Sequence, residues 1–288
     1  MLCTIGDLVE DIVVWLAHEP SHASDTPAHI SRTRGGSAAN VALFSANVYG
    51  SSRFIGQIGD DRLGTQLCDL LIDGGVDVRV QRQGRTGSIV VLVYRDGERT
   101  MLTDRGSCTH LASVPKDCLD GVNALHVPAY SLVVDPLASA AANAIGEALA
   151  RGIFVSIDAS STSMLSDFGV GAFCELIAHL APDAFICNGD EAELLGLSPS
   201  QPIDGARLTI IKHGAQPTVA ISQDKTTTRL SVPPVTDILD TTGAGDAFAA
   251  GFLGSFVVSG DVLEALRSGH ALAARVLRSP GATLASAI

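Results

Sequence analysis

Short apolar runs alternate with longer amphipathic stretches over the second half of the chain. Four of these runs predict strands, at residues 122–127, 153–158, 184–188 and 207–212. The amphipathic stretches 137–151 and 170–180 predict the helices between them. Alternation of this kind builds a parallel sheet with helices on both faces, so the sequence predicts an α/β fold. Ligands of such sheets bind beyond the carboxyl ends of the strands.

The first half of the chain carries the same elements with one interruption. Strands are predicted at 2–9 and 53–58, and helices at 37–49 and 63–72. The interruption is a pair of strand-like runs, 88–94 and 99–103, separated by Asp96-Gly97. Asp-Gly between two such runs is typical of a hairpin. The stretch 20–33, rich in Ser, His and Pro, predicts loop or edge structure. We expect the hairpin to stand off the main sheet as a lid.

The C-terminal part completes the pattern. It predicts strands at 218–222 and 227–232, then helices at 245–258 and 262–277. The chain has 288 residues and no internal repeat. This length suits one large domain, 1–288, with lid segments at about 11–34 and 85–106.

Composition and charge exclude several classes of protein. The net charge of −12 argues against a nucleic-acid partner, because binding to phosphate backbones requires patches of Lys and Arg. The uncharged run 247–260 is shorter than the roughly 20 apolar residues that a bilayer requires, so no membrane span is expected. Asp7, Glu10 and Asp11 lie in the first apolar stretch, which argues against a secretory signal. Six scattered cysteines without a Cys-x-x-Cys pair indicate free thiols in a reducing cytoplasm.

The run Asp240-Thr-Thr-Gly-Ala-Gly-Asp246 is the strongest chemical signal. Gly243 and Gly245 free the backbone to approach a ligand closely, and an apolar helix begins at once. Unpaired N–H groups and the positive end of the helix dipole would stabilise the charge on a transferring phosphoryl group. Asp246 could take the proton of an attacking hydroxyl. The alternative is that Asp246 only favours a helix start.

A second glycine motif opens an early helix, in the run Gly35-Gly36-Ser-Ala-Ala-Asn40 followed by Val-Ala. Asn40 offers a donor and an acceptor, which suits a polyol. A third run, Gly59-Asp-Asp-x-x-Gly64, stands at a strand-to-helix junction and could be a turn with a helix cap.

Together these three motifs resemble the signature regions of the ribokinase-like (PfkB) carbohydrate kinases, in the same order along the chain. The similarity extends from Gly6 to Ala282. It implies a three-layer α/β/α sandwich with a mostly parallel central sheet and a small β-strand lid. It also implies transfer of the ATP γ-phosphoryl group to a hydroxyl of a small carbohydrate such as fructose or ribose.

The resemblance further implies a role for each matching residue. Asp246 would be the catalytic base, and Gly243, Ala244 and Gly245 would form the anion hole. The sugar would be held by Asp11, Gly35, Gly36 and Asn40. The residues implied at the nucleotide are Asn188, Glu191, Lys212, Gly214, Thr242, Gly245, His270 and Ala274. Glu191 would support Mg²⁺ through water, and Asp240 a monovalent cation such as K⁺. Asn188 and Glu191 could instead be a helix cap, and His270 a packed helical histidine.

The acceptor is less well defined. Ser37 stands where ribokinases carry Lys, which weakens the case for ribose and leaves phosphoryl transfer intact. Arg105 follows the lid hairpin and could reach the pocket, as could Arg34. The resemblance implies that an arginine near the place of Arg105 binds the carboxylate in members acting on acidic sugars of the 2-keto-3-deoxygluconate type. The alternative is that Arg105 pairs with Asp104 or another lid acid. A nucleoside kinase also stays open.

Other classes of function fit less well. A Rossmann dehydrogenase needs Gly-x-Gly-x-x-Gly after the first strand, and a P-loop kinase needs Gly-x4-Gly-Lys-Ser/Thr, and the sequence has neither. A non-catalytic sugar or nucleotide sensor on the same fold would be expected to lose Asp246 or the glycines beside it. An exposed lid edge strand invites pairing, so the lid is the candidate surface for a homodimer.

Overall fold

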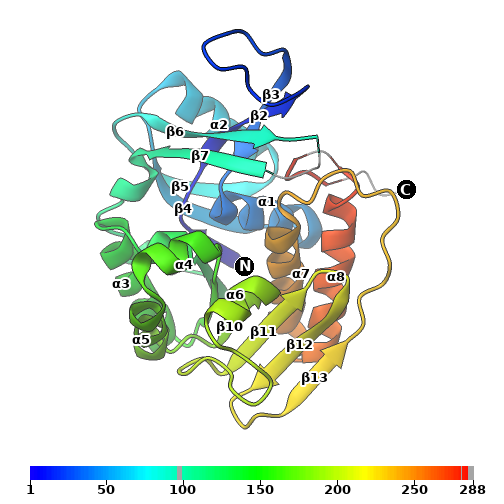
Figure 1. Cartoon of the computed structure of the whole chain (residues 1–288). Coiled ribbons are helices and arrows are strands. Elements are labelled where there is room, and N and C mark those ends of the chain that lie inside the picture. Colours follow the sequence, from blue (N-terminus) through cyan, green and yellow to red (C-terminus); the bar gives the residue numbers. More distant parts are fainter. Residues whose placement is uncertain (96–98, 280, 285–288) are drawn as a thin grey trace.

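The computed structural model describes residues 1–95, 99–279 and 281–284, which form a large and a small sheet with flanking helices (Figure 1). The large sheet has nine strands in the order β13-β12-β11-β10-β9-β8-β1-β4-β5. Its strands are β1 (Leu2–Ile5), β4 (Ser52–Ile58), β5 (Val76–Arg82), β8 (Ala124–Pro128), β9 (Phe154–Asp158), β10 (Ala184–Asn188), β11 (Leu208–His213), β12 (Gln216–Ser222) and β13 (Thr227–Leu230). All neighbours from β5 to β11 are parallel, whereas β12 and β13 are antiparallel. The predicted mostly parallel sheet is confirmed.

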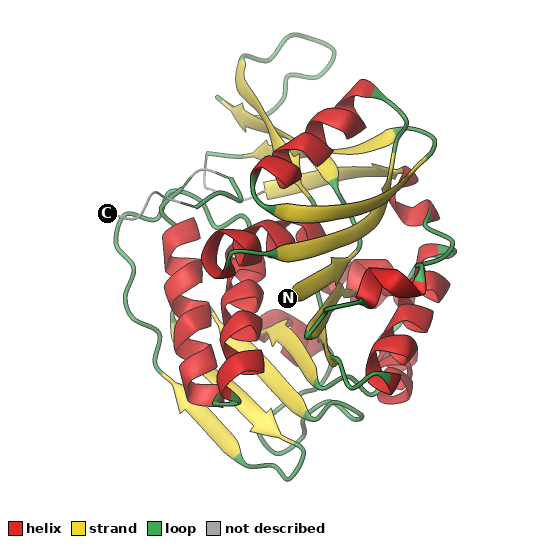
Figure 2. Cartoon of the chain, turned by 180° about the vertical axis from the view of Figure 1, so that it is seen from behind, coloured by secondary structure: helices red, strands yellow, loops and turns green. Residues whose placement is uncertain are grey.

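Helices cover both faces of this sheet (Figures 1 and 2). The described helices are α1 (Ser37–Tyr49), α2 (Arg62–Asp73), α3 (Leu137–Ala150), α4 (Thr162–Phe168), α5 (Val170–Leu180), α6 (Gly189–Leu194), α7 (Ala244–Ser259) and α8 (Val262–Val276). Residues of α1, α7 and α8 share one apolar cluster with Leu2 of β1, and residues of α3 and α5 share another with Cys3. Because neighbouring residues of a strand point to opposite faces, these helices form the two outer layers of a three-layer sandwich.

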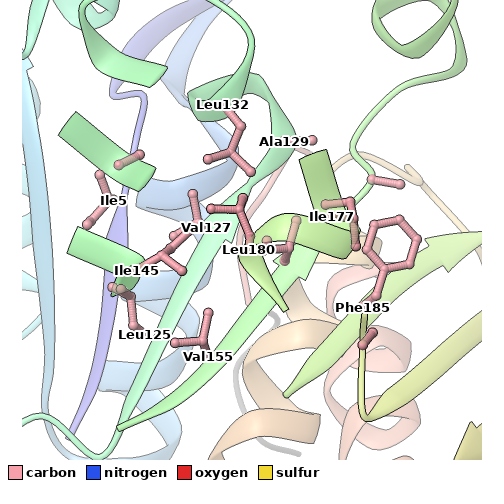
Figure 3. Close-up of a cluster of buried hydrophobic side chains, with 14 of the residues drawn as sticks. Ile5, Leu125, Val127, Ala129, Leu132, Ile145, Val155, Ile177, Leu180 and Phe185 are labelled. Atoms are coloured by element: carbon pink, nitrogen blue, oxygen red, sulfur yellow. The ribbon is translucent and has the colours of Figure 1, made fainter. Parts of the chain in front are cut away.

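Burial on both faces explains why the central strands are almost continuously apolar. Leu125 and Val127 of β8, Val155 of β9 and Phe185 of β10 are fully buried. They pack with Ile145 of α3 and other members of the cluster that Figure 3 shows. The strand ends at the carboxyl edge of this rigid core carry the polar residues of the site.

The small sheet has the order β3-β2-β6-β7. Its strands are β2 (Val9–Leu16), β3 (Ala28–Gly35), β6 (Thr86–Val93) and β7 (Arg99–Gly106). The hairpin of β6 and β7 is confirmed by antiparallel pairing down to Val93 and Arg99, while the predicted Asp96-Gly97 turn lies outside the described residues. The stretch predicted as loop or edge structure contains the edge strand β3, with loop before it.

Two sequence predictions about strands were wrong. The single strand predicted over 2–9 is two strands, because the chain leaves the large sheet at Gly6 and enters the small sheet at Val9. A Cβ at Gly6 would meet the Ser131 hydroxyl, so the crossover requires glycine. Strand β5 was missed because polar residues alternate with valine along an edge strand. No described helix combines the length and apolar character needed to cross a bilayer.

Candidate functional site

A cavity of about 670 Å³ lies between the small sheet and the carboxyl ends of the large sheet's strands. Side chains of the small sheet line it, among them Asp11, Val13, Trp15, Ile89, Val91, Arg99 and Arg105. From the large sheet and its loops come Asp7, Tyr130, Asp158, Asn188, Glu191 and Lys212, and from the start of α7 come Gly243, Gly245 and Asp246. The cavity therefore joins the early and late motifs of the sequence.

Asp246 lies in the first turn of α7, at the wall of this cavity. Ser37 Oγ donates a hydrogen bond to its Oδ1, and Asn40 Nδ2 donates one to its Oδ2, each at 2.7 Å. Burial raises the pKa of Asp246 to about 7, although these two hydrogen bonds oppose the rise. A carboxyl group with this pKa can act as a general base near neutral pH.

Arg34 lies behind the cavity wall and was wrongly expected to reach into the pocket. Its Nη1 donates to Asn40 Oδ1 at 2.6 Å, which orients the amide so that its NH₂ group points to Asp246. Gly35 also does not line the cavity, contrary to its predicted contact with substrate. A Cβ at Gly35 would overlap the Asp11 carboxylate, so this glycine provides room for Asp11.

Asp11 and Arg105 both line the first cavity from the small sheet. Asp11 lies inside β2 and not at the end of the first strand, and burial together with the charge of Asp7 raises its pKa to about 6. Arg105 Nη1 donates to Asp7 Oδ2 at 2.7 Å, and its guanidinium lies 4.1 Å from the centre of the Tyr130 ring. The predicted partner Asp104 instead pairs with Arg85. Arg105 is thus paired with Asp7 and still lines the cavity.

The Asp240 carboxylate organises the loop before α7. Its Oδ1 accepts hydrogen bonds from Thr242 N and Thr242 Oγ1, both at 2.8 Å, and its Oδ2 accepts one from Gly281 N at 2.9 Å. Arg99 Nη2 also donates to Asp240 Oδ1 at 2.7 Å. A guanidinium therefore lies where the family resemblance implies a monovalent cation.

A second cavity, of about 660 Å³, opens on the other side of the start of α7. Gly214, Ala244, Phe248, His270, Ala274 and Leu277 are among the residues that line it. His270 is nearly buried, with its ring 5.2 Å from that of Phe248, which confirms a packed histidine. Asn188, Lys212, Thr241 and Gly245 line both cavities. The two cavities therefore meet beside the start of α7.

A cluster of buried charges lies at this meeting point. Lys212 lies in β11, as the strand predicted over 207–212 requires, and its Nζ lies 3.0 Å from Asp158 Oδ2. Asn188 and Glu191 form a capping box on α6, so the helix-cap interpretation is confirmed while both also line the first cavity. Burial and the charge of Asp158 raise the pKa of Glu191 to about 7. The described residues contain no group of three His, Cys, Asp or Glu that could hold a metal ion.

Several residues of the site were not found from the sequence. Asp158 is the last residue of β9, and Asp7 and Tyr130 lie just beyond the ends of β1 and β8. The rule that ligands bind at the carboxyl edge could therefore have indicated all three. Ser37 and Arg99 have no such signal. The third glycine run is structural, because Asp61 caps α2 and accepts hydrogen bonds from Thr86.

Comparisons with known proteins agree with this geometry. A family model described as "pfkB family carbohydrate kinase" matches residues 1–287. The ATP-dependent ribose-1-phosphate kinase of Halopiger xanaduensis is 34% identical over 257 residues, which cover 86% of this chain and 81% of that protein. The probable chloroplastic fructokinase-6 of Arabidopsis thaliana is 28% identical over 246 residues, covering 80% of this chain and 64% of that protein.

Among solved structures, the adenosine kinase of Sinorhizobium meliloti superposes with a TM-score of 0.85 at 23% identity, over 98% of this chain and 94% of that one. A probable sugar kinase of Rhizobium etli gives a TM-score of 0.86 at 20% identity, over 99% and 95%. These similarities show that the fold is ribokinase-like. The family match extends over nearly the whole chain, and the chain therefore belongs to the pfkB family of carbohydrate kinases.

Proposed function

We propose that this kinase transfers the γ-phosphoryl group of ATP to a hydroxyl of a small sugar. The observation that carries the proposal is the junction of two cavities beside the start of α7. The first cavity is lined by charged groups such as those of Asp11, Arg105 and Asp246. The second is lined largely by apolar residues such as Phe248 and Leu277. A sugar in the first and a nucleotide in the second would meet next to Asp246.

Asp246 is the proposed catalytic base. Its carboxylate borders the first cavity, and Ser37 and Asn40 fix both of its oxygens. The backbone N–H groups of Gly243, Ala244 and Gly245 stand at the N-terminus of α7, where the helix dipole stabilises negative charge. A hydroxyl of the sugar would give its proton to Asp246 while these N–H groups stabilise the phosphoryl oxygens.

The second cavity is the proposed nucleotide site. His270 and Ala274 of α8 would border the adenine, and Gly214 would lie along the nucleotide. Lys212 lies next to Gly245, since a Cβ there would be 3.4 Å from Lys212 Nζ, so its ammonium would neutralise charge at the transferring group. The charge of Asp158 raises the pKa of Lys212 although burial opposes this, so the ammonium stays protonated.

The junction of the two cavities also suits Mg²⁺. Mg²⁺ in kinase sites keeps several waters and phosphate oxygens and needs only one or two carboxylates from the protein. Glu191 lines the cavity, as does Asp158. Burial and the charge of Asp158 raise the pKa of Glu191 to about 7, and a bound cation would oppose this rise by attracting the ionised carboxylate. Glu191 would hold Mg²⁺ through water, and the bound ion would supply charge neutralisation between the phosphates.

The favoured acceptor is a neutral sugar. The charge of Arg105 is balanced by Asp7, and Asp11 adds a carboxyl group to the same end of the cavity. An acidic or phosphorylated sugar is the second candidate, because the Arg105 guanidinium borders the cavity and the relative with 34% identity is named a ribose-1-phosphate kinase. A nucleoside acceptor has no comparable aromatic support beyond Trp15 and Tyr130.

The small sheet, with residues of the segments 11–34 and 85–106, is the proposed lid of the single kinase domain. Closing it over the first cavity would exclude water, which otherwise accepts the phosphoryl group. Its other face exposes Ile30 by 58% and Leu102 by 55%, which supports the proposal that two copies pair through their lids. Light scattering of the wild type and of Leu102→Asp tests the dimer. If the proposal holds, the wild type has twice the monomer mass and Leu102→Asp has the monomer mass.

The free cysteines support a location in the reducing cytoplasm.

The decisive experiment is an ADP-release assay with Mg²⁺-ATP and a panel of acceptors. The panel contains fructose, ribose, ribose 1-phosphate, 2-keto-3-deoxygluconate and adenosine, with water as the blank. Turnover of one or more sugars above the blank is expected. A folded protein that binds ATP and releases no ADP with any acceptor would contradict the proposal and favour a sensor.

A further inference from the structure

Arg99 connects the small sheet to the loop before α7. It is the first residue of β7, and its guanidinium reaches two residues of the loop 240–243. Nη2 donates to Asp240 Oδ1 at 2.7 Å, and Nη1 donates to Thr242 Oγ1 at 2.6 Å. The side chains of Arg99 and Asp240 are only 23% and 15% exposed, so water screens this ion pair weakly. A pair this little exposed stabilises the folded structure more than the exposed pair Arg85–Asp104 of the same sheet does.

Asp240 links Arg99 to the backbone of the proposed anion hole through hydrogen bonds. Its carboxylate holds Thr242 N on one oxygen and Gly281 N on the other, so three separate segments of the chain meet on it. Gly243 follows Thr242 directly and is the N-cap of α7, with φ at 76°. Burial favours a neutral carboxyl, but the hydrogen bonds and the charge of Arg99 hold the pKa of Asp240 below its usual range. The carboxylate thus stays ionised and ordered.

We propose that Arg99 is a positioning residue for phosphoryl transfer, and that its guanidinium replaces the monovalent cation that the family resemblance implies beside Asp240. The proposal rests on the proposed function. It means that the loop of the anion hole is ordered by docking of the small sheet, and not by a dissolved ion. The enzyme would then be independent of K⁺, and the anion hole would form fully only when the lid lies over the acceptor.

The contacts leave little room for a second cation. Asp240 Oδ1 already has three donors, two from Thr242 and one from Arg99. Thr242 Oγ1 accepts from Arg99 as well, so it cannot offer that lone pair to an ion. A K⁺ ion bound between these oxygens would lie close to a fixed positive charge, and the repulsion at low dielectric opposes its binding. The planar fork of Arg reaches both oxygens at once, which a Lys ammonium cannot do in the same geometry.

The experiment compares the wild type with Arg99→Ala, Arg99→Lys and Arg32→Ala. Arg32 is the matched control, since it pairs with Glu10 on the same small sheet and is 64% exposed. Each protein is assayed for turnover in KCl, NaCl and choline chloride at equal ionic strength, with and without added guanidinium chloride. Hydrogen exchange of the peptide over residues 238–246 is measured in the same salts, because the Thr242 amide reports on the loop without any catalysis.

The wild type is expected to keep its rate within about 2-fold across the three salts, since no dissolved cation is required. Arg99→Ala should lower kcat by about 10-fold or more and speed exchange of the loop peptide, with partial recovery in guanidinium or K⁺. Arg99→Lys should lie between Arg99→Ala and the wild type, and Arg32→Ala should match the wild type.

Three results would overturn the proposal. One is activation of the wild type by K⁺ of about 5-fold or more over choline, which shows that a dissolved cation is needed. Another is an Arg99→Ala protein with unchanged rate and exchange, and the third is an equal loss in Arg32→Ala. The salt comparison uses only the wild type, so it decides even if Arg99→Ala does not fold. Absence of turnover with every acceptor would contradict the proposed function, while the exchange data would still decide on Arg99.

Discussion

The two sheets bury their apolar residues in different ways. The nine-stranded sheet is covered by helices on both faces, so Ile157 and Phe185 are fully buried. The four-stranded sheet turns one face to the first cavity, and on its other face Ile30 and Leu102 are more than half exposed. One sheet is therefore part of a close-packed core, whereas the other is held over the site by a limited set of contacts.

This difference separates the groups that we propose to perform the chemistry from those that we propose to contact the acceptor. Asp158 and Lys212 lie at the carboxyl ends of strands of the large sheet, and Asp246 lies in the first turn of a helix packed on it. Asp11 and Arg105 belong to the small sheet. We expect changes in the first group to reduce turnover for every acceptor, and changes in the second group to alter the choice of acceptor.

The largest expected effect is that of Asp246→Asn on turnover. Asparagine keeps the size of the side chain but cannot take a proton, so kcat should fall by about 10²–10⁴-fold for every acceptor. The KM values for ATP and sugar should change little, since both cavities keep their shape. Steady-state ADP release measures this, with binding of ATP followed by calorimetry. A rate close to that of the wild type would remove Asp246 from the mechanism.

The same division explains what could be predicted from the sequence. The strands of the large sheet and α7 were found, β5 excepted, because apolar periodicity and glycines are local signals. The pairs that complete the site join distant residues, since Asp7 and Arg105 are 98 positions apart and Arg99 and Asp240 are 141 positions apart. No local pattern encodes such pairs. Strand β5 was missed for a different reason, because an edge strand with alternating polar residues lacks the apolar run of a central strand.

Stability is expected to show the next largest contrast between the sheets. Ile157→Ala opens a cavity in the core of the large sheet and should lower the free energy of unfolding by about 2–5 kcal/mol. At protein concentrations low enough to dissociate the proposed lid dimer, Leu102→Ala, on the exposed face of the small sheet, should change it by about 0.5 kcal/mol or less. Urea unfolding followed by circular dichroism measures both. A loss for Leu102→Ala as large as that for Ile157→Ala would mean that the exposed face is packed in solution.

The choice of acceptor should depend on Arg105. Arg105→Ala removes the guanidinium from the cavity and leaves Asp7 unpaired. The added negative charge should lower kcat/KM for an anionic sugar by about 10-fold or more, and that for a neutral sugar by a smaller factor. The assay compares ribose 1-phosphate with ribose, using Arg85→Ala as a control on the exposed pair of the same sheet. Equal losses on both sugars would exclude a contact between Arg105 and an anionic group.

The smallest expected effect is that of Asp246→Asn on stability. The substitution that lowers turnover should stabilise the fold. Burial raises the pKa of Asp246 from 3.8 to about 7, so the folded state holds this proton more tightly than the unfolded chain does. The resulting stabilisation is complete below pH 3.8 and is lost as the pH rises to about 7. At pH 8 the ionised carboxylate thus destabilises the fold, and Asp246→Asn should be more stable than the wild type by about 1 kcal/mol, because the loss of one hydrogen bond offsets part of the gain. Urea unfolding at pH 5 and pH 8 tests this, since the advantage of the variant should grow with pH. A difference that does not change between the two pH values would mean that Asp246 is ionised in the folded protein throughout this range.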